Sequence, residues 1–359
     1  MRKLNSFFSR LCMVMLLALP MVFASCEDDE DSGNMVQDHS FYVVNEGQGN
    51  GSICFYDNDG IWHNNIYQEN NPGEKLGVTS TTAVFYNGKV YIVSKDNPCL
   101  VEADAATFKK TSSITKAVID DNQAYNFAVI NNTTGLIATG RGAYKTAINP
   151  LPAEGTKADK IIDGFCRDIY VLSGDYLFVI VDNTVKAYKS NDFSYIKDLG
   201  TANTGFAKAK DGSLWAANEN QLVKINIKDL TFEIIDLPEG YTVNYNSAAY
   251  TPTCLCASIS ENALYFVQKD GWTPKKAYKY DIDNNLVTEL VSDPNGYMFY
   301  GAGLTVNPKN GYVYATLIKG YGQDALSNTI IIVNGETKET VETIDYSGSF
   351  WFPSQIVFK

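Results

Sequence analysis

Histidine is scarce in this sequence, and its scarcity limits the chemistry that the chain can support. Of the 359 residues only His39 and His63 are histidines, and neither lies in a His-Glu-x-x-His pattern. The phosphate-binding pattern Gly-x-x-x-x-Gly-Lys-Ser/Thr is absent, as is a Gly-x-Gly-x-x-Gly run at a strand–helix junction. We therefore predict no Ser-His-Asp relay, no histidine-ligated metal, no cofactor and no catalytic residue.

Carboxylates offer two alternative kinds of chemistry. Asp57-Asn-Asp59-Gly60 begins like a calcium-binding loop but lacks the later bidentate Glu, so it favours a hairpin turn. Catalysis by carboxylates alone, as in a hydrolase or lyase, has no supporting pattern and is the least favoured class.

Aromatic side chains supply a different chemistry, that of binding. They make up 13% of the chain, with 23 Tyr and 18 Phe. Rigid rings mixed with guanidinium and amide groups suit a large amphipathic ligand. The candidate ligand-binding residues are Arg141, Tyr144, Phe165, Arg167, Tyr245, Trp272, Tyr300, Tyr321 and Trp351.

The sequence contains a repeating structural unit, and this unit must position the candidate binding residues. Short β-rich runs are separated by tight turns, from Asn87-Gly88 to Asn310-Gly311, at a mean spacing of about 45 residues. That spacing is typical of one four-stranded blade of a β-propeller. The candidate residues fall in loops between second and third strands and in linkers between blades, which share one face. The same segments supply Asn45, Glu46, Gln48, Asp96, Asn97, Tyr125, Asn218, Glu219, Asp270, Lys319, Gln323, Asp324 and Phe350.

The two ends of the repeat predict how the ring closes. Residues 41–46 read as a second strand with no first strand before it, and residues 352–359 read as a first strand with nothing after it. Pairing them completes a seventh blade and removes two exposed sheet edges. We predict an all-β, seven-bladed propeller over residues 41–359. A tandem of immunoglobulin-like domains would need two separable cores and a linker.

The net charge restricts the classes of binding partner, and the cysteine spacing indicates whether disulfides are expected. The net charge is −12, and residues 1–25 carry three basic and no acidic residues, so the remainder is more acidic still. Nucleic acid and acidic lipid headgroups are therefore poor partners. Five of the seven cysteines lie beyond residue 26 without a Cys-x-x-Cys spacing, so we expect buried free thiols rather than a disulfide framework.

The first forty residues predict export and anchoring. Residues 1–25 combine a basic start, an apolar run too short to span a membrane and small residues before Cys26. Phe23-Ala24-Ser25-Cys26 resembles a bacterial lipobox, which implies lipidation of Cys26. Residues 26–40 are expected to form an acidic, flexible tether. The acidic run resembles a signal for display on the outer face of the outer membrane. An ordinary secreted protein, or a spacer without an address, is the plainer alternative.

Four segments carry a family resemblance: residues 41–47, 50–57, 75–77 and 303–314. Together they resemble the YncE-like surface-layer propellers of Bacteroidetes, a group that includes BtuG-type surface lipoproteins. The resemblance covers roughly residues 41–115 and 299–359. It implies capture of a corrinoid, or another large amphipathic small molecule, and delivery to a TonB-dependent outer-membrane transporter. A glycan- or peptide-binding propeller of another uptake system, or a protein-binding scaffold, would share the fold and differ in its loops.

Overall fold

The computed structural model describes residues 39–359, apart from 154, 246–252, 293 and 349–350. The predicted signal peptide, the lipidated Cys26 and nearly all of the acidic tether lie outside the described residues. Among the residues described, no helix is long and apolar enough to cross a membrane.

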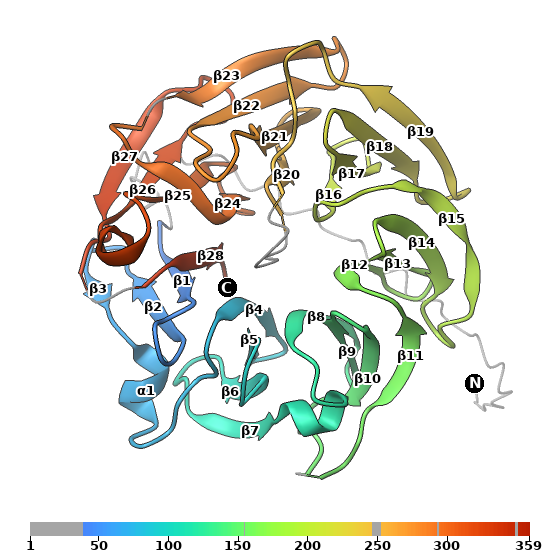
Figure 1. Ribbon diagram of the computed structural model, residues 1–359, viewed down its shortest axis with the longest axis vertical. Helices are drawn as coiled ribbons and strands as arrows, with labels where there is room; N and C mark the ends of the chain where they lie inside the picture. Colours follow the sequence, from blue (N-terminus) through green and yellow to red (C-terminus); the bar gives the residue numbers. More distant parts are fainter. Residues whose placement is uncertain (1–38, 154, 246–252, 293, 349–350) are drawn as a thin grey trace, which may run out of the picture. The chain divides into compact units, whose positions relative to one another are not determined.

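Within these residues, twenty-eight strands form seven four-stranded antiparallel sheets, the blades of the propeller (Figure 1). Blade 1 comprises β28 (Pro353–Val357), β1 (Phe41–Asn45), β2 (Ser52–Tyr56) and β3 (Trp62–His63). Blade 2 comprises β4 (Ser80–Tyr86), β5 (Lys89–Ser94), β6 (Leu100–Asp104) and β7 (Lys110–Ile114). Blade 3 comprises β8 (Ala124–Asn131), β9 (Thr134–Thr139), β10 (Gly142–Ala147) and β11 (Asp159–Asp163). Blade 4 comprises β12 (Cys166–Leu172), β13 (Tyr176–Val181), β14 (Thr184–Lys189) and β15 (Tyr195–Thr201).

The remaining blades repeat this order. Blade 5 comprises β16 (Ala207–Lys208), β17 (Leu214–Asn218), β18 (Gln221–Asn226) and β19 (Thr231–Asp236). Blade 6 comprises β20 (Leu255–Ala257), β21 (Ala263–Val267), β22 (Lys276–Asp281) and β23 (Leu286–Ser292). Blade 7 comprises β24 (Met298–Val306), β25 (Val313–Ile318), β26 (Asn328–Val333) and β27 (Thr340–Asp345). Three short helices lie in the connections: α1 (Ile66–Asn70), η1 (Lys116–Ile119) and η2 (Gly322–Leu326).

The predicted closure is confirmed. Strand β28 pairs antiparallel with β1, with Ile356 opposite Val43, so the end of the chain supplies the innermost strand of blade 1. Ser354 is fully buried, and its hydroxyl lies 2.9–3.1 Å from the carbonyl oxygens of Val44, Ser80 and Thr81. This one side chain therefore connects the closing strand to blades 1 and 2.

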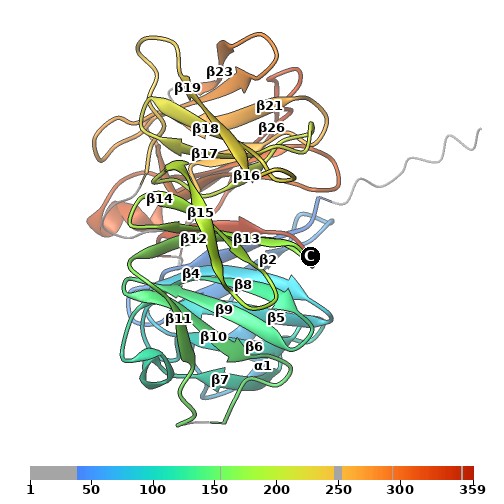
Figure 2. The ribbon, with the colours of Figure 1, turned by 90° about the vertical axis from the view of Figure 1, so that its right-hand side faces the viewer.

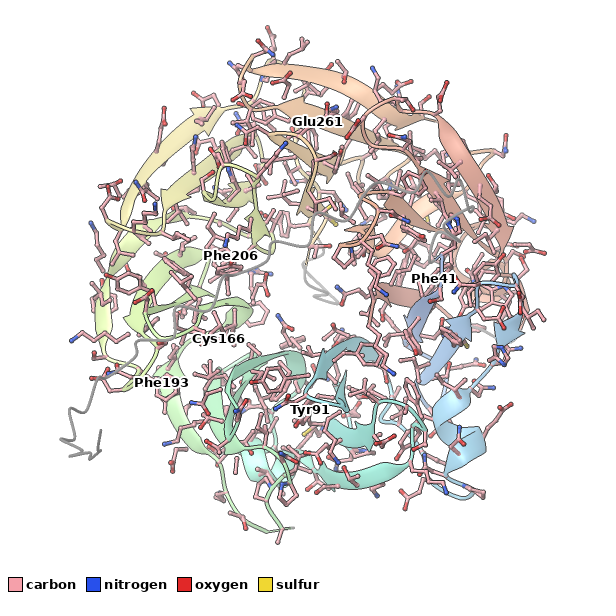
Figure 3. All side chains as sticks on the ribbon, turned by 180° about the vertical axis from the view of Figure 1, so that it is seen from behind. Phe41, Tyr91, Cys166, Phe193, Phe206 and Glu261 are labelled. Atoms are coloured by element: carbon pink, nitrogen blue, oxygen red, sulfur yellow. The ribbon has the colours of Figure 1, made fainter. Side chains whose placement is uncertain are left out.

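The core consists of apolar layers between neighbouring blades rather than one central core. Phe41 of blade 1 packs against Tyr314 of blade 7, with ring centroids 5.2 Å apart. Trp215 of blade 5, which is fully buried, lies edge-on to Tyr280 of blade 6. Figure 3 shows side chains between neighbouring sheets, among them the labelled Phe41 and Tyr91. Each blade is stable only against its neighbours, because a lone four-stranded sheet cannot cover both its faces.

The ring has two distinct faces, seen edge-on in Figure 2. On one face, the loops between second and third strands bond to the linkers between blades, as in Glu46 N to Phe352 O (2.9 Å) and Lys269 N to Thr242 O (2.8 Å). We name this the loop face. On the opposite face, hairpin turns bond to the turns before the outer strands, and the chain enters there, where His39 N donates to Asn58 Oδ1 (2.8 Å).

Candidate functional site

Aromatic and charged side chains, many of them in contact, form a belt on the loop face. Its members come from the second-to-third-strand loops or the linkers, or from the strand ends next to them. Each therefore projects from a segment that a rigid sheet holds in place. The belt consists of Glu46, Lys95, Tyr125, Phe165, Arg167, Tyr245, Lys269, Tyr300, Tyr321 and Phe352.

Through blades 2 to 6 the belt alternates cations with aromatic rings. The Lys95 ammonium lies 5.6 Å from the Tyr125 ring centroid, and the Tyr125 ring meets Phe165 edge-to-face at 5.4 Å. The Arg167 guanidinium lies 4.6 Å from the Phe165 ring and 6.0 Å from the Tyr245 ring. The Lys269 ammonium lies 5.3 Å from the centroid of the same Tyr245 ring. Cations at these distances are attracted by the ring faces and hold the rings in place.

Through blades 6, 7 and 1 the belt is mainly aromatic. Tyr300 stacks on Phe352 at 4.8 Å, and Tyr321 lies 6.5 Å from Tyr300. The Tyr300 hydroxyl donates to Glu46 Oε1 (3.1 Å), and the Tyr321 hydroxyl donates to the carbonyl oxygen of Trp272 (3.1 Å). Trp272 and Lys269 occupy one loop of blade 6, so both parts of the belt end at this loop.

Glu46 and Lys95 bring opposite charges into a buried part of the belt. Both side chains are more than nine-tenths buried. Burial raises the pKa of the Glu46 carboxyl, against the opposing effect of Lys95, and burial likewise lowers the pKa of the Lys95 ammonium. Burial and the nearby Glu46 raise the pKa of Tyr300, which keeps its hydroxyl protonated as a donor. The belt therefore holds one acidic and one basic group beside aromatic surface, and burial disfavours the charged form of each.

Arg167 is positioned by a polar cluster beside it. Its Nε donates to Asn183 Oδ1 (2.9 Å). The next residue, Asp168, is buried and accepts bonds from Asn126 Nδ2 (2.5 Å) and from the backbone N–H of Phe206 (2.7 Å). Burial raises the pKa of Asp168 to about 6, although these donors act in the opposite direction. The cluster joins blades 3, 4 and 5 directly beneath the belt.

The structure brings most of the predicted binding residues together. Phe165, Arg167, Tyr245, Tyr300 and Tyr321 belong to the belt. Two further predicted residues, both tryptophans, touch it: Trp272 through its carbonyl oxygen and Trp351 through an edge contact with Phe352 (5.5 Å). The exposed Arg141 lies in the β9–β10 turn, next to Gly140, whose Cα is flanked by Tyr125 and Phe165.

The prediction for Tyr144 is wrong. The β9–β10 turn contains only Gly140 and Arg141, so Tyr144 falls inside β10 rather than in a loop. Its side chain is 1% exposed and packs between blades, where its hydroxyl accepts from Asn122 Nδ2 (2.9 Å) and donates to Asp120 Oδ2 (3.2 Å). Tyr144 stabilises the core and is not available to a ligand.

Three belt residues were not predicted from the sequence: Lys95, Lys269 and Phe352. Lys95 directly follows the apolar second strand β5, and Lys269 lies shortly after the apolar second strand β21. Both lysines are at the start of a loop that the sequence already predicts on this face. That position is the signal that could have identified them. The sequence predicts Phe352 inside the closing strand, whereas it lies in the linker immediately before β28.

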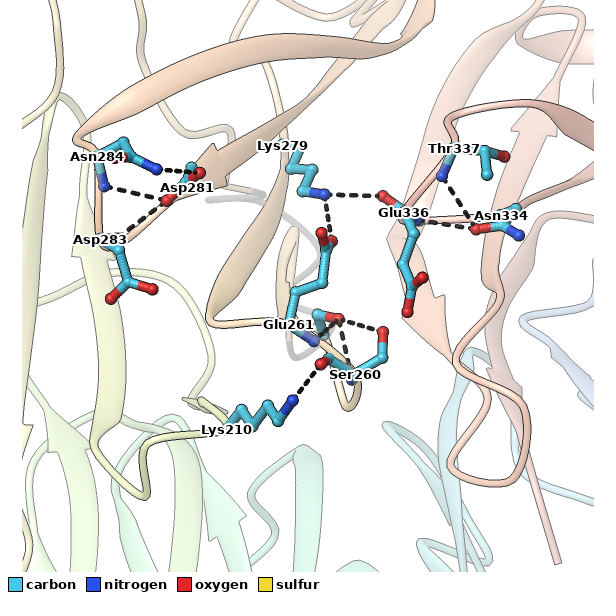
Figure 4. A network of polar contacts seen from close by, with 12 residues as sticks. Lys210, Ser260, Glu261, Lys279, Asp281, Asp283, Asn284, Asn334, Glu336 and Thr337 are labelled. Atoms are coloured by element: carbon cyan, nitrogen blue, oxygen red, sulfur yellow. Dashed lines mark hydrogen bonds and ion pairs between the residues drawn. The ribbon is translucent and has the colours of Figure 1, made fainter.

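On the opposite face, polar side chains form bonds between neighbouring blades. The Lys279 ammonium forms an ion pair with Glu261 and lies 3.2 Å from the carbonyl oxygen of Gly335 in blade 7, while the Lys210 ammonium of blade 5 bonds to the carbonyl oxygen of Ser260 (Figure 4). Within the part of the chain that the structure describes, no three His, Cys, Asp or Glu side chains could hold a metal ion together.

The fold is a closed, seven-bladed β-propeller. Residues 39–359 match the family described as Domain of unknown function (DUF5074), and the chain belongs to that family. No curated protein matches it.

Solved structures support the fold. A quinonprotein alcohol dehydrogenase-like protein from Bacteroides thetaiotaomicron is 21% identical, with a TM-score of 0.70 over 90% of this chain and 78% of that one. A putative 6-phosphogluconolactonase from Bacteroides uniformis is 12% identical, with a TM-score of 0.63 over 89% and 99%. The extracellular domain of a putative one component system from B. thetaiotaomicron is 14% identical, with a TM-score of 0.51 over 73% of this chain and 33% of that one. At these identities the likeness concerns the fold alone.

Proposed function

We propose that this protein is a non-enzymatic binding propeller that captures a corrinoid, or another large amphipathic small molecule, on the belt. The observation that carries the proposal is the belt, in which rings and cations from several blades and their linkers contact one another on one face. A corrin is flat, with apolar faces and a fringe of amides. It therefore suits aromatic rings flanked by hydrogen-bonding groups.

The absence of a catalytic pattern supports binding rather than turnover. One of the two histidines, His63, lies on the outermost strand of blade 1 and bonds through Nε2 to Asp57 Oδ2 (2.7 Å), far from the belt in the fold. His39 lies where the chain enters the opposite face. Neither can serve as a general base for a ligand on the loop face.

We further propose that lipidation of Cys26 anchors the protein on the outer membrane, exposed at the cell surface, and that it delivers its ligand to a TonB-dependent transporter. The resemblance to BtuG-type lipoproteins and the lipobox-like residues support this. Because the chain enters the propeller opposite the belt, a short tether from Cys26 would leave the belt open to ligand. The membrane would then be contacted through the lipid alone.

Titration calorimetry of the purified protein with cyanocobalamin tests the binding proposal. Tyr321, half exposed in the belt, is matched by Tyr195, equally exposed on the outer strand β15. We expect Tyr321→Ala to weaken binding by about tenfold, the loss of roughly 1.4 kcal/mol of ring contact, and Tyr195→Ala to leave it unchanged. An absence of heat with the wild-type protein would refute corrinoid binding.

A further inference from the structure

A separate polar pocket lies on the loop face where the last blade meets the first. Its volume is about 370 Å³. Four segments distant in sequence enclose it: the β1–β2 loop, the start of α1, the η2 turn and the linker before β28. The lining residues are Gly47, Gln48, Asn50, Gly51, Ser52, Asn65, Gln68, Gln323, Leu326 and Trp351.

The backbone around this pocket is closely constrained. Gly47 N donates to the carbonyl oxygen of Trp351 (3.0 Å), which ties the β1–β2 loop to the linker. Gly47 has φ +72°, and a Cβ there would lie 1.7 Å from Asn50 O. A Cβ on Gly51 would lie 1.9 Å from Ser80 Oγ. These contacts fix the wall of the pocket before any ligand arrives.

The pocket is lined by amides and carries no charged side chain. Five of its ten lining residues are Asn or Gln. Gln68 Nε2 donates to Gly51 O (2.7 Å), while Gln68 Oε1 is buried and has no donor among the described residues. An anionic ligand would find no cation in the lining.

We propose that this pocket binds a neutral sugar unit. Amide side chains can donate to and accept from hydroxyl groups, and the ring of Trp351 offers apolar surface for the C–H face of a pyranose. The volume lies at the low end of the range of about 300–1,000 Å³ typical of small-molecule sites. It suits one or two sugar rings and is too small for a whole corrinoid. The inference does not depend on the ligand of the belt.

Saturation-transfer NMR and calorimetry of the full protein test this site. The probes are methyl glycosides of glucose, galactose and mannose, together with N-acetylglucosamine, maltose and cellobiose; glucuronate is the charged control. We expect at least one neutral sugar to bind with Kd below about 10 mM, and glucuronate to bind at least about fivefold more weakly.

Variants then locate the bound sugar. Trp351→Ala should weaken sugar binding at least about tenfold, and Gln323→Ala should weaken it about threefold. Trp272→Ala, which removes an exposed tryptophan of the same face outside the pocket, should change it less than about twofold. If no neutral sugar of the panel binds, or if Trp351→Ala and Gln323→Ala bind it as the wild type does, the proposal is wrong. Cyanocobalamin binding in the same preparations separates this outcome from failure of the belt.

Discussion

Replacing Ile356 by Ala tests the closure of the ring, because this side chain lies on the strand that joins the two ends of the chain. Ile356 is fully buried, pairs with Val43 and packs in the layer that contains Phe41 and Tyr314. The change removes three carbon groups, which at about 0.8 kcal/mol each account for roughly 2.4 kcal/mol of transfer free energy. The cavity left between two stiff sheets adds to this, so we expect a total loss of about 3–4 kcal/mol.

Urea unfolding followed by tryptophan fluorescence measures this loss. The control is Val341→Ala on the outer strand β27, where the side chain is 44% exposed. We expect the control to change the free energy of unfolding by less than about 0.5 kcal/mol. A loss below about 1 kcal/mol for Ile356→Ala would mean that β28 does not hold the ring closed.

Three further predictions concern other parts of the propeller. Because the folded pKa of Asp168, about 6, lies above its unfolded value, this group stabilises the fold at low pH and loses that effect as pH rises through 6. The unfolding free energy of wild type relative to Asp168→Asn should therefore fall by roughly 2 kcal/mol between pH 4 and 7, and a flat difference in urea titrations would contradict this. Gly47→Ala should destabilise more than Gly88→Ala, although both have positive φ, because only at Gly47 would the added Cβ meet backbone; equal midpoints of thermal unfolding would refute the steric argument. Burial raises the pKa of the Cys99, Cys166 and Cys254 thiols to about 12. A disulfide reagent at pH 8 should therefore label these thiols only after urea is added. Rapid labelling of the folded protein would count against their burial.

The propeller could be predicted from the sequence because its determinants are local. Turns such as Asn87-Gly88 need positive φ at both residues, and the structure has φ 50° and 74° there. The turn between β18 and β19 is equally local, because Asp229 Oδ1 accepts from Thr231 N (3.0 Å) and Thr231 Oγ1 (2.7 Å). Closure followed from counting strands, since residues 41–46 lacked a first strand.

The candidate site could be predicted only in part. Loop membership is a local property, which is why Phe165, Arg167 and Tyr321 were placed on the correct face. The direction of a side chain at a loop edge depends on where the strand begins, and a two-residue turn moved Tyr144 into the core. The partners of Lys95 include Tyr125 of blade 3 and Glu46 of blade 1, so no local pattern marks Lys95 as part of a belt.

The central claim, that the loop face binds the ligand, is tested most directly by amide hydrogen exchange with and without saturating cyanocobalamin. We predict slower exchange in residues 268–275 and 319–327, which carry Lys269, Trp272 and Tyr321, and unchanged exchange in the turns at 104–109 and 226–230 on the opposite face. Protection confined to those turns, or found nowhere in the propeller, would contradict the account.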